Sequence, residues 1–259
     1  MAMRADSYLC VFGYTESRTR AARLISEGKV IVDGKTVSKP SEEIYGEEHD
    51  VIVTELDRYV SRGGLKLEAA IREFKIDVSG KKCIDVGAST GGFTDCLLQH
   101  GACRVCAVDS GQGQLHEKVK SDPRVVSLEG YNARNLSREE LGDFDIAVMD
   151  VSFISQTLIH PALSGVLNDG AIFVSLIKPQ FEAGKSALCK KGIVKDAKDR
   201  ETAVLRVCES AFLSGFELMG LANSPIEGGD GNREYLACFQ RREHPEKTID
   251  LKQVKNLVR

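Results

Sequence analysis

The sequence lacks three features that would indicate other classes of protein. No apolar run approaches the roughly 20 residues of a membrane-spanning helix, so we expect no membrane segment. Residues 1–10 show no positively charged start followed by an apolar stretch, so we expect a cytoplasmic protein whose eight cysteines are reduced. The net charge of −3 excludes a chain that is basic throughout, so any contact with nucleic acid must come from local patches.

The cysteines also offer no complete metal site. Cys103 and Cys106 have the spacing of half a zinc knuckle, but no second pair of cysteines or histidines has a matching spacing. They fall in a run that predicts a β-strand, where residues three apart point to opposite faces. We therefore expect no bound metal ion.

A local patch of positive charge is present near the N-terminus. Ser17 is a candidate helix cap, apolar residues follow it at helical spacing, and Gly28 is a candidate helix stop. Residues 29–37 are predicted to form a β-hairpin that turns at Asp33-Gly34. The basic candidates for RNA binding are Arg18, Arg20, Arg23, Lys29 and Lys35. On charge alone, a solvated surface is the simpler interpretation.

Residues 6–55 resemble the S4 RNA-binding module. The resemblance rests on Ser17-Arg18 at the helix start, on the Leu-Ile-x-x-Gly-x-Val-x-Val-x-Gly run that begins at Leu24, and on Lys39-Pro-Ser41. It implies a small α+β fold that contacts structured RNA through shape and backbone rather than base sequence. The acidic stretch from Glu42 onward is expected to face away from the RNA.

The rest of the chain is long enough for one full α/β domain. We predict an S4-like domain over residues 1–56, a short linker over 57–60 and a catalytic domain over 61–259. Apolar runs that alternate with helical stretches predict a Rossmann-like, mostly parallel sheet covered on both faces. The runs are Cys83–Val86, Val105–Val108, Val125–Leu128, Ile146–Met149 and Ile172–Ile177. Two later strands are joined by a connection too short for a crossover helix, so the last strand should be antiparallel.

The first strand of this sheet ends in a glycine-rich turn, Asp85-Val-Gly-Ala-Ser-Thr-Gly-Gly92, that leads into a helix. Such a turn binds nucleotide-like cofactors, because glycines permit close approach and the helix start offers free N–H groups. The turn lacks the G-x-G-x-x-G spacing of a dinucleotide site, and its single acid fits the amino end of S-adenosylmethionine better than a pyrophosphate. Asp109 ends the next strand, where it can bind ribose hydroxyls.

The candidate cofactor-binding residues lie in this turn, after later strands and before the first helix of the domain. They are Ser61, Arg62, Gly63, Asp85, Gly87, Ser89, Gly91, Gly92, Asp109, Asn132 and Asp150. We expect Asn132 to read the adenine edge and Asp150 to touch both cofactor and substrate. Residues 61–64 are expected to close over the ligand.

Four charged residues should meet on the same edge of the sheet. Asp150 and Lys178 end parallel strands, Glu234 begins the antiparallel strand, and Lys66 opens the helix before the first strand. Each has an ordinary structural explanation when taken alone, such as a helix-surface lysine or a strand-end charge. Their joint position beside the cofactor turn predicts a catalytic site, with Lys178 steering or deprotonating the substrate hydroxyl.

Five motifs resemble the TlyA family, whose members join an S4 module to an FtsJ-type methyltransferase domain. They are Ser61-Arg-Gly-Gly-Leu-Lys66, Asp85-Val-Gly-Ala-Ser-Thr-Gly-Gly-Phe93, Met149-Asp-Val-Ser-Phe153, Ile177-Lys-Pro-Gln-Phe181 and Gly231-Asn-Arg-Glu234. The resemblance implies methyl transfer from S-adenosylmethionine to the ribose 2′-hydroxyl of cytidine in ribosomal RNA, with the four charged residues as a catalytic tetrad. It also implies ribosomal RNA or ribosomal subunits as partners.

Other interpretations stay open. A non-catalytic RNA- or ribosome-binding factor could retain the methyltransferase fold, although the intact tetrad favours an enzyme. A small-molecule methyltransferase would leave the N-terminal basic module unexplained. Members of the family are also labelled hemolysins, but no membrane-spanning or strongly amphipathic segment supports that activity here. The basic segment 184–195 is predicted to be a mobile, RNA-facing lid, with a solvated loop as the alternative.

Overall fold

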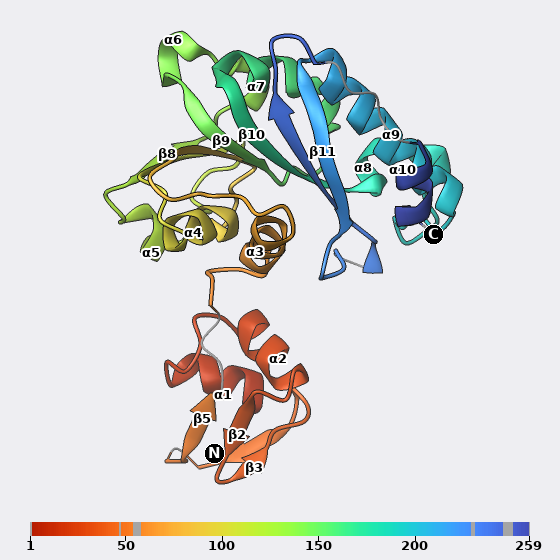
Figure 1. Ribbon diagram of the computed structural model, residues 1–259. Coiled ribbons are helices and arrows are strands. Elements are labelled where there is room, and N and C mark those ends of the chain that lie inside the picture. The colour runs from red at the N-terminus through yellow and green to blue at the C-terminus, as the bar shows by residue number, and fades with distance from the viewer. Residues whose placement is uncertain (1, 47, 54–57, 229–230, 246–250, 259) are drawn as a thin grey trace. The chain divides into compact units, whose positions relative to one another are not determined.

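The computed structural model describes residues 2–46, 48–53, 58–228, 231–245 and 251–258 (Figure 1). The chain divides into two compact units, Met1–Arg58 and Tyr59–Arg259. The predicted linker, 57–60, begins at Asp57, which lies outside the described residues.

The first unit is a small α+β fold. Its described elements are β1 (Ala2–Arg4), α1 (Ala5–Val11), α2 (Arg18–Ser26), β2 (Val30–Val32), β3 (Lys35–Thr36), β4 (Glu43–Tyr45) and β5 (Val51–Val53). β1 pairs with β4, and β2 lies between β3 and β5, with every pairing antiparallel. Tyr8, Leu9, Leu24, Ile25 and Ile44 fill the core between the helices and the strands.

The helix and hairpin predicted for this unit are confirmed. The Ser17 side chain accepts a hydrogen bond from the Arg20 N–H at 3.3 Å, which caps α2. Gly28 ends the helix region with a φ of +69°. Asp33 and Gly34 both have positive φ, as the two-residue turn between β2 and β3 requires.

The second unit contains a seven-stranded sheet in the order β11-β12-β10-β9-β6-β7-β8. The strands are β6 (Lys82–Val86), β7 (Arg104–Asp109), β8 (Val125–Glu129), β9 (Phe144–Met149), β10 (Leu167–Ile177), β11 (Phe216–Asn223) and β12 (Tyr235–Arg241). β12 runs antiparallel to both neighbours, and the other pairings are parallel. The predicted Rossmann-like sheet with an antiparallel last strand is therefore confirmed.

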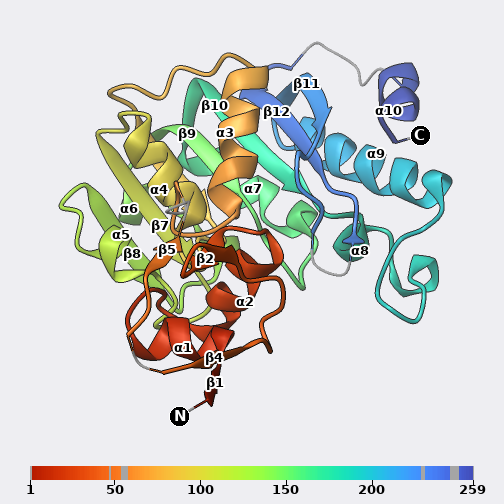
Figure 2. The ribbon, with the colours of Figure 1, turned by 90° about the horizontal axis from the view of Figure 1, so that it is seen from below.

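Successive strand residues point to opposite sides of this sheet, so both of its faces are apolar and helices cover each of them. α3 (Gly63–Glu73), α4 (Gly92–Gln99) and α5 (Glu117–Lys120) pack on the face that carries Cys83 and Val105 (Figure 2). α7 (His160–Val166), α9 (Ala197–Leu213) and α10 (Leu251–Val258) pack on the face that carries Ile84 and Phe173. Short helical segments complete the connections: α6 (Arg138–Leu141), α8 (Pro179–Glu182), η1 (Ala133–Asn135), η2 (Gln156–Leu158) and η3 (Lys185–Ala187).

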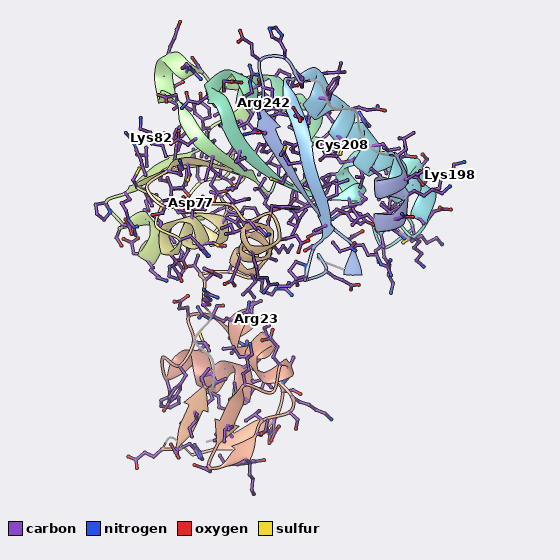
Figure 3. All side chains as sticks on the ribbon, viewed as in Figure 1. Arg23, Asp77, Lys82, Lys198, Cys208 and Arg242 are labelled. Atoms are coloured by element: carbon purple, nitrogen blue, oxygen red, sulfur yellow. The ribbon has the colours of Figure 1, made fainter. Side chains whose placement is uncertain are left out.

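Helix α9 illustrates how one face is buried. Cys208 lies between α9 and the sheet, whereas Lys198 on the same helix reaches into solvent (Figure 3). Among the described residues, no helix is both long enough and apolar enough to cross a bilayer.

The pairing of the strands fixes which residues share the functional edge. β6, β7, β9 and β10 run parallel, so their carboxyl ends lie on one edge. β12 begins on that same edge, because Tyr235 pairs with Ile177 at the end of β10. Lys178, which follows Ile177, and Glu234, which precedes Tyr235, are therefore brought to one edge from distant parts of the sequence.

Candidate active site

The glycine-rich turn between β6 and α4 has a backbone that few other sequences could adopt. Gly87 has a φ of +85°, and a Cβ added to it would lie 2.5 Å from the Asp150 carbonyl oxygen. Gly91 caps α4 in the left-handed conformation, and Ser89 also has a positive φ of +48°. The turn therefore approaches the end of β9 closely, which only glycine at position 87 permits.

Asp109, at the end of β7, holds the loops around this turn. Its Oδ2 accepts a hydrogen bond from the Ser89 N–H at 2.8 Å, and its Oδ1 accepts one from the Gly111 N–H at 2.7 Å. Both carboxylate oxygens keep a second lone pair for a ligand. The carboxylate is thus oriented before any ligand binds.

A cavity of about 480 Å³ opens at this part of the sheet edge. The predicted cofactor-binding residues that line it are Gly87, Ser89, Asp109, Asn132 and Asp150. Its wall also contains residues that the sequence did not single out, among them Gly111, Gln114, Tyr131 and Ile154. Two carboxylates and a glycine turn suit a ligand that carries ribose hydroxyls and positive charge. S-adenosylmethionine fits this wall.

Asn132 lines the cavity with a constrained side chain. Its Oδ1 accepts hydrogen bonds from the Arg134 N–H at 3.1 Å and from Arg134 Nε at 3.2 Å. The amide NH₂ group remains to donate to a ligand.

Asp85 lies beneath the turn and does not line this cavity. Its side chain is fully buried, and its Oδ2 accepts a hydrogen bond from the Thr94 hydroxyl at 2.6 Å. Its Oδ1 is buried without a hydrogen-bond partner among the described residues. Burial raises the pKa of Asp85 to about 7, against the opposing hydrogen bond from Thr94. Asp85 therefore supports the turn from below and does not face the cofactor cavity.

The segment before α3 packs against the start of α4 and does not line this cavity. A Cβ added to Gly92 would collide with the Ser61 hydroxyl and would lie 3.0 Å from the Gly64 nitrogen. The Val60 N–H donates to Asp95 Oδ2 at 2.9 Å and ties the segment to α4. Of the predicted residues, Ser61 and Gly63 lie against Gly92, and Arg62 caps α3, whereas Gly91 faces Leu115 and Val119.

The four charged residues of the sheet edge form two ion pairs. Lys66 Nζ lies 2.5 Å from Glu234 Oε2, and Lys178 Nζ lies 2.6 Å from Asp150 Oδ1. Only 2% of the Glu234 side chain and 12% of each lysine side chain is exposed, so water screens these charges weakly. Lys178 Nζ also donates a hydrogen bond to the Ser152 hydroxyl at 2.8 Å.

A second cavity, of about 700 Å³, borders this charged cluster. Lys178 and Glu234 line it together with residues of the segment 184–192, including Lys185 and Lys191. Residues 152–154 line both cavities, so the two cavities meet at that loop. The arrangement places one lysine–carboxylate pair between a cofactor-sized space and an open, partly basic space.

Phe153 was not predicted as a site residue, although it lies in one of the quoted motifs. It has a φ of +63°, which is rare for a residue with a bulky side chain. Its side chain is 92% exposed, and its ring centroid lies 5.2 Å from that of Phe181. A backbone conformation and an exposure of this kind leave no signal in the sequence. Ser152 and Gln180 are further residues of the second cavity that sequence reasoning missed.

The basic residues predicted to bind RNA in the first unit lie close to acidic side chains. The pairs are Arg18–Asp6, Arg20–Glu16, Arg23–Glu27 and Lys29–Glu27, with N–O distances from 2.8 to 3.7 Å. Lys35 is exposed at the tip of the hairpin. Hydrogen bonding to Arg4 and then to Arg18 lowers the pKa of Asp6, against its partial burial.

Comparisons with known proteins agree on both units. Residues 59–241 match the FtsJ-like methyltransferase family, and residues 3–50 match the S4 domain. The chain is 45% identical to "Hemolysin A" of Brachyspira hyodysenteriae over 92% of its own length and 99% of that protein. It is 44% identical to the "16S/23S rRNA (cytidine-2'-O)-methyltransferase TlyA" of Mycobacterium tuberculosis, over 90% of this chain and 88% of that protein.

A solved structure described as a hemolysin from Streptococcus thermophilus is 41% identical to this chain. The match covers 99% of this chain and 94% of that one, with a TM-score of 0.79.

Proposed function

The chain belongs to the TlyA family of FtsJ-like methyltransferases, and we propose that it methylates the ribose 2′-hydroxyl of a cytidine in ribosomal RNA. The observation that carries this proposal is the Lys178–Asp150 ion pair between the two cavities, with the Lys66–Glu234 pair bordering the second cavity. The mycobacterial relative is named for 2′-O-methylation of cytidine in 16S and 23S RNA, which supports the choice of acceptor.

The first cavity is the proposed cofactor site. S-adenosylmethionine supplies a methyl group on a positively charged sulfur, and it is already a strong methyl donor. Asp109 accepts hydrogen bonds from the ribose hydroxyls, and the Asn132 amide donates to the adenine edge. The backbone of Gly87 and Ser89 lies against the methionine end, close to Asp150. Asp85, Ser61, Arg62, Gly63, Gly91 and Gly92 act by keeping the turn in shape.

The proposed role of Lys178 is to align the acceptor. Beside the Asp150 carboxylate, its ammonium group donates a hydrogen bond to the 2′-oxygen and directs a lone pair toward the methyl carbon. Such alignment can supply much of the rate enhancement, because the methyl donor needs no further activation. With S-adenosylmethionine bound, the O–C bond would form as the S–C bond breaks, and the hydroxyl proton, made acidic by the new bond, would pass to water. Lys66 and Glu234 form the second ion pair, which borders this position.

Phe153 is the proposed platform for the target base. An exposed, strained aromatic residue at the junction of the two cavities can stack on a nucleobase that has left its helix. Stacking would bring the ribose of that nucleotide to Lys178. Lys185 and Lys191, in the segment beside the second cavity, would contact the flanking phosphates.

The S4 unit is proposed to bind the structured RNA around the target, within ribosomal RNA or a ribosomal subunit. Its candidate contacts are Arg18, Arg20, Arg23, Lys29 and Lys35. Since ion pairs at the protein surface are weak, phosphates can replace the acidic partners of these side chains. RNA affinity should therefore fall steeply as the salt concentration rises.

The test is to incubate the protein with labelled S-adenosylmethionine and either ribosomal subunits or free ribosomal RNA. Lys178→Ala should abolish methyl transfer and leave cofactor affinity nearly unchanged, because Lys178 lies outside the cofactor cavity. Lys198→Ala, on the exposed side of α9, is the matched control and should behave as the wild type. Binding of cofactor and RNA without any transfer by the wild type would instead support a non-catalytic RNA-binding factor.

A further inference from the structure

The buried carboxylate of Glu182 has no part in the proposed chemistry. Glu182 is the last residue of α8, and only 3% of it is exposed. It forms no salt bridge with a described residue; the nearby Arg206 guanidinium donates its hydrogen bond to the Glu182 backbone carbonyl at 3.0 Å. Burying a carboxylate without a salt bridge is costly even with the Arg206 charge nearby, so its retention calls for a reason.

Both oxygens of this carboxylate bind the loop that follows β9. Oε2 accepts a hydrogen bond from the Ser155 hydroxyl at 2.5 Å, and Oε1 accepts one from the Gln156 N–H at 2.9 Å. Gln156 is itself buried, and its side-chain carbonyl accepts a hydrogen bond from the Ser175 hydroxyl in β10. The loop is therefore fastened to two elements, α8 and β10, by charge-assisted and buried hydrogen bonds.

The fastened loop carries the groups that face the two cavities. Ser152 accepts the hydrogen bond from Lys178, and Phe153 stands exposed with its positive φ. A strained backbone of this kind persists only where the surrounding structure determines it. The anchors at Ser155 and Gln156 lie two and three residues beyond Phe153, and the Phe181 ring, next to Glu182 in the sequence, contacts Phe153.

We propose that Glu182 is a positioning residue that holds Ser152 and Phe153 in place for the acceptor nucleotide. The proposal rests on the proposed function, since it assigns the loop to the handling of RNA. Burial raises the pKa of Glu182, while the hydrogen bonds from Ser155 and Gln156 act in the opposite direction. The hydrogen bonds that lower the pKa of Glu182 are therefore the same ones that anchor the loop.

The proposal is tested with Glu182→Ala, Glu182→Gln and the control Glu209→Gln, whose parent side chain is exposed on α9. Loss of the anchor should displace the loop from the position that aligns the acceptor. We therefore expect kcat with ribosomal subunits to fall about 10- to 100-fold. The Kd of S-adenosylmethionine should rise less than kcat falls, because residues 152–154 also line the cofactor cavity while the glycine turn and Asp109 lie on other elements. Glu182→Gln keeps an acceptor for the Gln156 N–H and should recover most of the activity.

Two further measurements separate positioning from a general loss of structure. The double variant Glu182→Ala/Phe153→Ala should lose less activity than the product of the two single losses, because both changes affect the placement of Phe153. Amide hydrogen exchange of residues 152–156 should become faster in Glu182→Ala, while the strands keep their protection. If Glu182→Ala does not fold, Ser155→Ala removes one of the two hydrogen bonds and takes its place.

Wild-type kinetics and unchanged exchange in Glu182→Ala would overturn the proposal, as would multiplicative losses in the double variant. The failure of the proposed function looks different. In that case the wild type transfers no methyl group to RNA, and the exchange measurement alone decides the role of Glu182.

Discussion

The two cavities that meet at the sheet edge differ in the groups that shape them. The cofactor cavity is built around a glycine turn with a constrained backbone and a carboxylate already bound to two N–H groups. The acceptor cavity is lined by residues that come from three distant parts of the sequence. We infer that cofactor recognition fails when the backbone of the glycine turn is altered, whereas acceptor recognition depends on the paired charged side chains.

The largest expected effect comes from breaking the buried pair on the acceptor side. Lys66→Met leaves Glu234 buried without its partner, which should lower the free energy of unfolding by about 3 kcal/mol. Methyl transfer should become undetectable. The double variant Lys66→Met/Glu234→Gln removes both charges and should regain most of the stability in chemical denaturation, yet no activity. Recovered activity in the double variant would show that the pair only supports the fold.

The next prediction adds a single methyl group to the backbone of the cofactor cavity. Gly87→Ala would place a Cβ against the Asp150 carbonyl in a backbone conformation that alanine rarely adopts. We expect cofactor binding, measured by calorimetry, to weaken at least about 100-fold, on the order of 3 kcal/mol. Gly165→Ala in α7, where nothing lies within 4 Å of the added Cβ, is the control and should bind normally. Normal binding by Gly87→Ala would contradict a backbone-built site.

A smaller effect is expected from the aromatic residue between the cavities. Phe153→Ala removes a stacking surface worth about 1–3 kcal/mol per base, so kcat/KM for RNA should fall roughly 5- to 150-fold. The Kd of the cofactor should change less than kcat/KM, since Phe153 also lines the cofactor cavity but the turn and Asp109 are untouched. Leu213→Ala, at an equally exposed apolar position on α9, is the control. A loss confined to cofactor affinity would show that Phe153 acts in the cofactor cavity and has no part in acceptor binding.

The smallest effect concerns Asp85 beneath the turn. Its pKa of about 7 in the folded protein exceeds that of an unfolded aspartate, so the folded state binds the extra proton and loses stability as pH rises through 7. Without cofactor, the free energy of unfolding should fall by about 1 kcal/mol between pH 6 and pH 8 from this group. The Asp85→Asn variant should lack that part of the pH dependence in urea denaturation. An unchanged slope would show that Asp85 is ionised throughout.

The sheet and its edge could be predicted from the sequence because periodicity and connection length carry that information. Buried parallel strands appear as apolar runs, and the short connection before Tyr235 forces the last strand to be antiparallel. Once that strand lies beside β10, Lys178 and Glu234 must share an edge. This is why the cluster could be located, although its pairing of Lys66 with Glu234 could not.

Other features depend on depth and on backbone conformation, which the residue pattern does not encode. Asp85 was expected at the methionine end of the cofactor, but the structure buries it below the turn. The exposure of Phe153 and the hydrogen bonds of Glu182 depend on how the loop after β9 packs against α8, which the sequence pattern does not reveal. The acidic partner of Arg18 lies twelve residues away, at Asp6, so the charge of the S4 helix could not be judged from its own sequence.

The most direct test of the central claim is to identify the atom that receives the methyl group. Ribosomal RNA labelled by the protein is hydrolysed in alkali, which cannot cleave next to a methylated 2′-oxygen. We predict that the label appears in alkali-resistant dinucleotides whose first nucleoside is 2′-O-methylcytidine, as identified by mass spectrometry. Label in single nucleotides that carry a methylated base would contradict the account.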